Sequence, residues 1–215
     1  TYTIEALMHD GKALQSGTSH YFGDGFAKAF DIVYTDKNNN PVTPFETSWG
    51  TSTRLIGAII MTHGDDNGLV LPPAIAPVQA VLVPIAMHKE RVLEKANGVY
   101  DRLKKICRAK IDTSEQTPGW KFAEYEMKGV PLRIELGPKD IENNSCVVVR
   151  RDNGEKTTVL LDELESKIPE LLKAVRDGLY NKALERRANM TFTAHTLDEM
   201  KEIADNKPGF IKAMW

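Results

Sequence analysis

An apolar run of strand length, Val78–Ile85, is the feature that most constrains the fold of this chain, and it is bounded by Pro77 and Pro84. Because most of the run does not alternate between apolar and polar side chains, we expect a strand that is buried on both faces of a sheet. A helical pattern follows over residues 88–109, where apolar side chains recur at spacings of three and four: Val92, Ala96, Val99, Leu103 and Ile106. A strand followed by a helix predicts an α/β fold with a parallel portion in its sheet.

The chain continues to alternate in this way beyond residue 109. Residues 130–136 alternate between apolar and other side chains, which is typical of a half-buried strand. Cys146–Val149 predicts another strand, and an Asn-Gly turn returns the chain as its antiparallel partner over Thr157–Leu161. The apolar spacing of residues 164–179 predicts a helix with Pro169 in its first turn. The whole segment is therefore predicted to be a small mixed sheet with helices.

The predicted helix over residues 88–109 has a strongly basic polar face, interrupted only by Glu90, Glu94 and Asp101. Two interpretations remain open: a solvated helix face, or a surface that contacts phosphate groups. Over the whole chain, 28 Lys and Arg residues nearly balance 30 Asp and Glu residues. This balance excludes a polycationic tail, but it leaves a local basic patch possible.

Residues 1–77 are rich in glycine and end in a cluster of prolines, which is typical of a connection between domains. We predict one domain over 1–77, a second over 78–187, and a linker or the start of another domain over 188–215. The only two cysteines, Cys107 and Cys146, exclude a disulfide framework or a cysteine-rich zinc site within the chain. No apolar run approaches the ~20 residues of a membrane span, and the N-terminus lacks a signal-peptide pattern. We therefore expect a soluble, cytoplasmic protein.

Two polar segments of the first domain have the composition of a ligand site. In ALQSGTSH, small residues allow close backbone approach while Gln15, Thr18 and His20 offer hydrogen bonds; a capped turn followed by an exposed histidine is the simpler interpretation. In TSWGTSTRLIGAII, a polar strand broken by glycine leads into an apolar helix, with Arg54 at the junction. A guanidinium there suits a polyphosphate, and a surface arginine beside a buried Trp49 is the alternative.

A third segment, His63–Gly68, combines paired acids with a histidine. Such a set is able to bind a metal ion, and a capped helix end followed by a turn explains it equally well. The motifs GxxxxGK[ST], GxGxxG and GxSxG are absent from the chain. P-loop, Rossmann and α/β-hydrolase chemistry are therefore unsupported.

Together these segments resemble the prolyl-tRNA synthetase family of class II aminoacyl-tRNA synthetases. LMHDGKALQSGTSHYFGDGFAKAFDI is similar to the family's proline-pocket segment, and TSWGTSTRLIGAIIMTHGDDNGLVLPP to its third class II motif. IAPVQAVLVPI and GWKFAEYEMKGVPLRIELGPKDIENNSCVVVRRDNGEK resemble its anticodon-binding domain. The resemblance covers essentially all of the chain, and it is closer to the archaeal and eukaryote-like form without an inserted editing domain. It implies α/β architecture: part of a catalytic domain with an antiparallel sheet, then a mixed-sheet anticodon-binding domain.

The resemblance also implies a site for ATP and proline, at positions Gln15, Thr18, His20, Ser48, Trp49, Gly50 and Arg54. Gln15 and Thr18 match contacts to ATP, His20 matches a proline-pocket residue, and Arg54 matches the catalytic arginine that clamps ATP. The implied reaction is attack of the proline carboxylate on the α-phosphate of ATP, with Mg²⁺, followed by prolyl transfer to the 3′-terminal ribose of tRNA. Positioning and charge stabilisation dominate such chemistry, which agrees with a site that has no acid–base dyad.

In the second domain, the positions that match anticodon-facing residues of the family are Phe122, Glu126, Arg133, Asp140 and Lys156. Aromatic side chains stack on the splayed bases of RNA loops. Proline anticodons carry two guanines, whose O6/N7 edge is read by arginine and whose N1/N2 edge donates to carboxylates. A core aromatic remains an alternative for Phe122, and a solvent-facing strand residue for Arg133.

The first and second class II motifs would precede Thr1, and the chain begins without Met. We therefore expect a C-terminal portion of a homodimeric synthetase that does not activate proline alone. Without the rest of the catalytic domain, the third-motif helix should expose apolar side chains, namely Leu55, Ile56, Ile59 and Ile60. Many members of the family carry a cysteine-ligated zinc in a domain that would follow residue 215.

Two other interpretations remain open. The first is a tRNA-binding paralogue without catalysis, although such a protein has no physical need to retain Gln15, Thr18, His20 and Arg54. The second is a class IIa synthetase for another amino acid, such as threonine or glycine. Threonine enzymes read the substrate hydroxyl with zinc, and residues 1–77 show no Cys/His ligand set for it.

Overall fold

The computed structural model describes residues 1–89 and 91–214, so Glu90 of the predicted basic helix lies outside the described residues. The chain divides into two compact units: residues 1–62 together with those from 187 onward, and His63–Arg186. We predicted the first boundary near residue 77. Residues 63–77 instead belong to the second unit, because Leu69 N donates to Met127 O and Leu71 N donates to Gly129 O.

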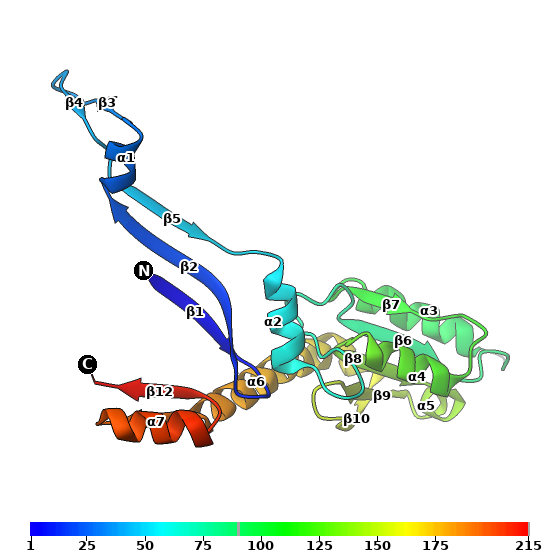
Figure 1. The fold of residues 1–215 in the computed structure, drawn as a ribbon. Coiled ribbons are helices and arrows are strands. Elements are labelled where there is room, and N and C mark those ends of the chain that lie inside the picture. The colour runs from blue at the N-terminus through cyan, green and yellow to red at the C-terminus, as the bar shows by residue number, and fades with distance from the viewer. Residues whose placement is uncertain (90, 215) are drawn as a thin grey trace. The chain divides into compact units, whose positions relative to one another are not determined.

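The second unit contains a five-stranded mixed sheet in the order β10-β9-β8-β6-β7 (Figure 1). Its strands are β6 (Ala80–Pro84), β7 (Ala109–Ile111), β8 (Leu132–Leu136), β9 (Ser145–Arg150) and β10 (Lys156–Leu160). The strands β7, β6 and β8 run parallel, whereas β9 and β10 are antiparallel to their neighbours. The predicted mixed sheet and its hairpin are therefore confirmed.

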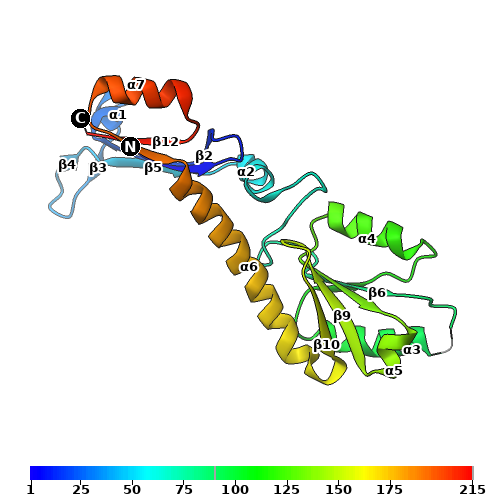
Figure 2. The ribbon, with the colours of Figure 1, turned by 90° about the horizontal axis from the view of Figure 1, so that it is seen from below.

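Helices cover both faces of this sheet: α3 (Val92–Leu103), α4 (Pro118–Met127), the short α5 (Pro138–Glu142) and α6 (Leu164–Asn189). Figure 2 shows α3 on one face of the sheet and α4 on the other. Along β6, Ala80 and Leu82 pack into a large core with α3 and α6, while Val81 and Val83 pack into a smaller cluster with Tyr125 of α4. Because successive side chains of a strand point to opposite faces, this arrangement explains why every residue of β6 is apolar.

Two element predictions are wrong in their bounds. The helix expected over residues 88–109 is only α3, because Arg91 has a left-handed backbone at φ 67° before it and the chain enters the unpredicted strand β7 after it. Pro169 lies inside α6 rather than in its first turn, because the helix already begins at Leu164 after a 3₁₀ turn, Leu161–Glu163. The proline has no N–H, so α6 lacks one hydrogen bond at that point.

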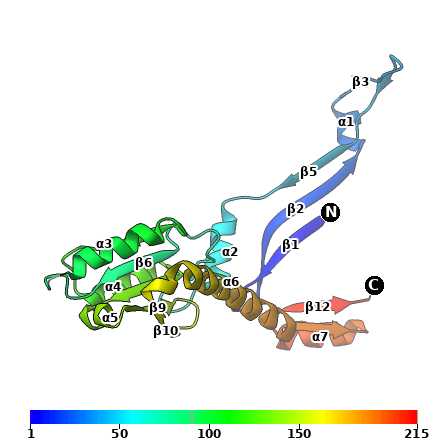
Figure 3. The ribbon, with the colours of Figure 1, turned by 180° about the vertical axis from the view of Figure 1, so that it is seen from behind.

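The first unit is built on a three-stranded antiparallel sheet in the order β1-β2-β5 (Figure 3). Its elements are β1 (Tyr2–Leu7), β2 (Ala13–Gly23), α1 (Gly25–Ala29), β3 (Tyr34–Thr35), β4 (Pro41–Val42), β5 (Glu46–Gly50) and most of α2 (Arg54–His63). A parallel pair, β11 (Thr191–Ala194) and β12 (Phe210–Ala213), connected by α7 (Leu197–Asn206), completes it. Gly11, at φ 79°, lies directly against Pro208, so the β1–β2 turn packs on the segment before β12.

The first unit leaves much of its apolar surface uncovered. Leu55, Ile56 and Ile60 of α2 are exposed, as predicted, whereas Ile59 is half-buried. Tyr21 and Phe45, which stack on each other with ring centroids 6.3 Å apart, are also exposed. Within the described residues, no helix is both long and apolar enough to cross a membrane.

Candidate functional sites

One open pocket of about 320 Å³ lies on the first unit's sheet. Its lining includes every position predicted from the sequence for ATP and proline: Gln15, Thr18, His20, Ser48, Trp49, Gly50 and Arg54. These residues come from β2, from β5 and from the start of α2. The structure thus brings together residues that are up to 39 positions apart in the chain.

Strand pairing explains how most of these residues share one face. His20 pairs with Ser48 and Thr18 pairs with Gly50 across the antiparallel ladder, so these four positions point to the same side. Gln15 would point to the opposite side in a regular strand. However, the β1–β2 register shifts between Gly17 and Gln15, and this bulge returns Gln15 to the face of Thr18.

Arg54 stands at the N-terminus of α2, and its Nη1 donates to the carbonyl oxygen of Gln15 at 3.4 Å. This contact points the guanidinium across the pocket, where the positive end of the helix dipole adds to its charge. Trp49 is 80% exposed, so the alternative of a surface arginine beside a buried tryptophan is wrong. By strand alternation its side chain shares a face with Tyr2 and Ile4, and it also borders an apolar pocket of about 350 Å³ there.

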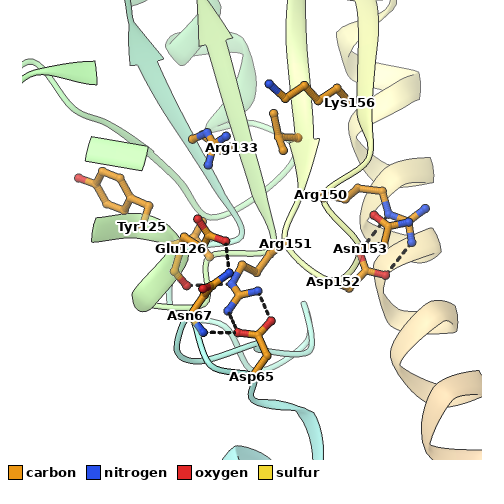
Figure 4. Close-up of a pocket in the computed structure, with 13 residues that line it drawn as sticks. Asp65, Asn67, Tyr125, Glu126, Arg133, Arg150, Arg151, Asp152, Asn153 and Lys156 are labelled. Carbon is orange, nitrogen blue, oxygen red and sulfur yellow. Dashed lines mark hydrogen bonds and ion pairs between the residues drawn. The ribbon is translucent and has the colours of Figure 1, made fainter. Parts of the chain in front are cut away.

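A larger pocket, of about 450 Å³, lies in the second unit (Figure 4). Its walls are the segment after α2, the end of α4, the strand β8 and the β9–β10 hairpin. Of the five predicted anticodon residues, Glu126, Arg133 and Lys156 line it. Asp140 lies elsewhere and has a local task, because its Oδ2 accepts a hydrogen bond from Gly137 N at 2.8 Å and so caps α5.

Arg133 and Phe122 form one stacked unit beside this pocket. The guanidinium carbon lies 4.2 Å from the centre of the Phe122 ring, and Nε donates to Glu135 at 3.0 Å. The Arg133 side chain is only 16% exposed, so the solvent-facing alternative does not describe it. Phe122 is half-buried against the smaller core cluster, which leaves the guanidinium as the surface next to the pocket.

Asp65, Asn67 and Arg151 also line this pocket, and sequence reasoning did not connect them to it. Arg151 donates to both carboxylate oxygens of Asp65, at 2.6 and 2.7 Å, and this pairing lowers the pKa of Asp65. Asp65 is therefore paired with a guanidinium, and within the described residues no group of three His, Cys, Asp or Glu side chains is placed to hold a metal ion. The metal interpretation of the His63–Gly68 segment is not supported.

Three of the basic residues around α3 make contacts within the second unit. Arg102 forms two hydrogen bonds with Glu165 of α6, at 2.5 and 2.6 Å, and Lys104 pairs with Asp101. Arg108 donates to main-chain carbonyls of the segment that precedes β6, at Pro73, Ala74 and Ala76. These contacts favour a structural, solvated face over a dedicated phosphate surface.

Comparisons with known proteins found similarity in both units. A family model described as an anticodon binding domain matches residues 79–171. Over all 215 residues the chain is 65% identical to the proline--tRNA ligase of Clostridium novyi, 63% to that of Ruminiclostridium cellulolyticum and 59% to that of Clostridium botulinum strain 657. The chain covers 45% of each, so it spans about half the length of the curated relatives it matches. The similarity to these bacterial proteins does not test the predicted archaeal and eukaryote-like form.

Proposed function

We infer that this chain is part of a proline--tRNA ligase and carries a portion of its adenylate site together with its anticodon-binding domain. One observation carries the inference: all seven positions that match the ATP and proline residues line a single pocket. The relatives are proline--tRNA ligases along the whole chain, which favours proline over threonine or glycine as the amino acid.

In the first step, an oxygen of the proline carboxylate attacks the α-phosphorus of ATP, and the bond to pyrophosphate breaks. Arg54 suits the triphosphate because its fork of N–H donors stays charged and matches phosphate oxygens. Thr18, Ser48 and His20, held on one face of a paired ladder, supply donors and acceptors whose positions are set before the substrate arrives. These are positioning and electrostatic tasks, and none of them requires a proton to move through the chain.

Mg²⁺ is implied for ATP chemistry of this kind and would neutralise phosphate charge when bound. The lining of the first pocket includes no carboxylate. We therefore assign no metal ligand and no metal-dependent step to the described residues. Their proposed part is to hold the triphosphate and the amino acid.

In the second unit, Arg133, Lys156 and Glu126 offer two cations and one carboxylate to a single pocket. A guanine presents acceptors on one edge and donors on another, so this combination suits guanine. One face of the Arg133 guanidinium stacks on the Phe122 ring. The other face also provides a flat surface on which a splayed base stacks. We propose this pocket as the reader of the two guanines of a proline anticodon.

The experiment is to measure the dissociation constant of this chain for proline tRNA at one stated salt concentration. The matched control is the same tRNA with both anticodon guanines replaced. By analogy with base readout in DNA, losing one good contact should weaken binding by about 1–3 kcal/mol, whereas phosphate contacts persist in both tRNAs. Equal affinity for the two tRNAs would contradict an anticodon reader in this chain.

A further inference from the structure

The segment His63–Gly68 forms a tight turn against the end of α4. Asp65 and Gly68 exchange two main-chain hydrogen bonds, and Asn67 N donates to the Asp65 carboxylate at 3.0 Å. Gly68, at φ 127°, sits so close to Met127 that an added Cβ would lie 2.6 Å from its carbonyl oxygen. The turn is therefore in direct contact with the last residues of α4, beside Glu126.

Arg151 holds this turn and the end of α4 together. Its side chain is 6% exposed, its two terminal nitrogens bind Asp65, and its Nε donates to the main-chain carbonyl of Glu126 at 2.8 Å. The last carbonyls of a helix lack partners within the helix, and a cation at that end also matches the helix dipole. Arg151 thereby fixes the main chain at Glu126 (Figure 4).

Asn67 fixes the other end of the same residue. Its side-chain Nδ2 donates to Oε1 of Glu126 at 3.1 Å. A carboxylate has about four acceptor sites, so one amide donor sets the plane of the group and leaves acceptor sites for a further partner.

We propose that Asn67 is a positioning residue for anticodon reading, which holds the Glu126 carboxylate in the plane where it accepts from a guanine. Arg151 and Asp65 secure the turn that carries it. The proposal rests on the proposed function, since it assumes that this pocket binds the anticodon. It gives the His63–Gly68 turn, which follows the third-motif helix, a part in the pocket of the second unit.

The test compares Asn67→Asp with Asn144→Asp. Asn144 also donates a side-chain hydrogen bond to an exposed carboxylate, Asp162 at 2.9 Å, but it does not line the pocket. Both variants turn an amide–carboxylate hydrogen bond into a repulsive pair and add the same charge. The readout is the ratio of dissociation constants for tRNAs with and without each anticodon guanine, because general electrostatic effects cancel in that ratio.

Asn67→Asp is expected to lower the ratio of dissociation constants by about five- to tenfold for one guanine. This is the size of effect expected when one oriented hydrogen bond to a charged group is lost. Asn144→Asp should leave it unchanged. Glu126→Gln should reduce discrimination at the same guanine, and adding Asn67→Asp to it should cause no further loss, because both act through one carboxylate.

Four results would count against these ideas, and they distinguish a failure of the proposed function from a failure of this inference alone. A wild-type chain that does not discriminate between the tRNAs overturns the proposed function, and this inference with it. A wild-type chain that discriminates while Asn67→Asp discriminates equally well overturns the inference alone. Additive losses in the double variant, or full discrimination by Glu126→Gln, also overturn the inference, since Asn67 would then not act through Glu126.

Discussion

Lys121 is almost completely buried in the second unit, with 1% of its side chain exposed. Its Nζ donates to the carbonyls of Asp112 and Ser114, at 3.0 and 2.7 Å, and lies 3.4 Å from the Asp112 carboxylate. Tyr125 and Ser114 donate to the same carboxylate at 3.0 and 2.6 Å. A buried charge is tolerated only when it is paired and hydrogen-bonded, and this cluster meets both conditions. It fixes the connection between β7 and α4, and α4 carries Glu126.

The Asp112 carboxylate should make stability depend on pH. Burial opposes its ionisation, but the hydrogen bonds from Ser114 and Tyr125 and the charge of Lys121 prevail and lower its pKa from 3.8 to about 2. A pKa depressed in the folded state stabilises the fold above the unfolded value, and the effect disappears as the pH falls from about 4 to about 2. Wild type should therefore lose about 2 kcal/mol over this interval that Asp112→Asn does not lose.

Urea unfolding of the two proteins between pH 2 and pH 6 measures this difference. Ser114→Ala removes one donor and should reduce the difference without abolishing it. Parallel pH profiles for wild type and Asp112→Asn would show that the carboxylate is not held in its ionised form.

Individual residues show how far sequence reasoning reaches into a site. Residues that belong to one contiguous motif, such as the predicted set around Thr18 and His20, lie together in one pocket. Asp65 and Arg151 are 86 positions apart, and no local pattern indicates that a turn and a hairpin will meet there. Asp140 lies three residues after Gly137, which is the spacing of a helix cap, and its carboxylate fulfils that role, while its match to an anticodon-facing position stays a prediction.

Two helical glycines allow one substitution to be tested in contrasting surroundings. An added Cβ at Gly178 of α6 would lie 2.6 Å from Oδ2 of Asp152 and 3.2 Å from Nη2 of Arg150. The Asp152 carboxylate is 1% exposed and is held by Arg150 through two hydrogen bonds, so it cannot move aside freely. Gly98 of α3 would meet nothing within 4 Å.

Gly98→Ala should raise the free energy of unfolding by about 0.5–1 kcal/mol, because alanine has the higher helix propensity. Gly178→Ala gains the same propensity, but overpacking costs about 1–3 kcal/mol, so a net loss of stability is expected. Denaturant unfolding of both variants measures the two signs. Stabilisation by both substitutions would mean that the hairpin does not pack tightly on α6.

Secondary-structure elements were predictable where a pattern extends over several residues. The apolar run of β6 and the alternation of β8 mark strands by side-chain chemistry alone. The strand β7 has only three residues, which is too short for a period to show, and it exists because it pairs with β6. The register shift that turns Gln15 toward Thr18 is equally a property of pairing with β1, and not of the strand's own sequence.

At the scale of the whole molecule, the two units differ strongly in the core that each can bury. Eighteen buried residues form one cluster in the second unit. In the described part of the first unit the buried apolar residues are Leu7, Met8, Ala27, Ala58 and Ala194. Because burial of apolar surface is the main favourable contribution to folding, the second unit should be much more stable than the first.

Hydrogen exchange of the chain under native conditions measures this difference residue by residue. Amides of β6, such as those of Leu82 and Val83, should exchange only through opening of the second unit. Amides of β2 and β5, such as those of Thr18 and Ser48, should open with a free energy lower by at least about 2 kcal/mol. The spectroscopic unfolding curve should accordingly show two transitions rather than one. Equal opening free energies in β6 and β2 would contradict this prediction, because they would require the first unit to be stabilised by much more than its own buried side chains.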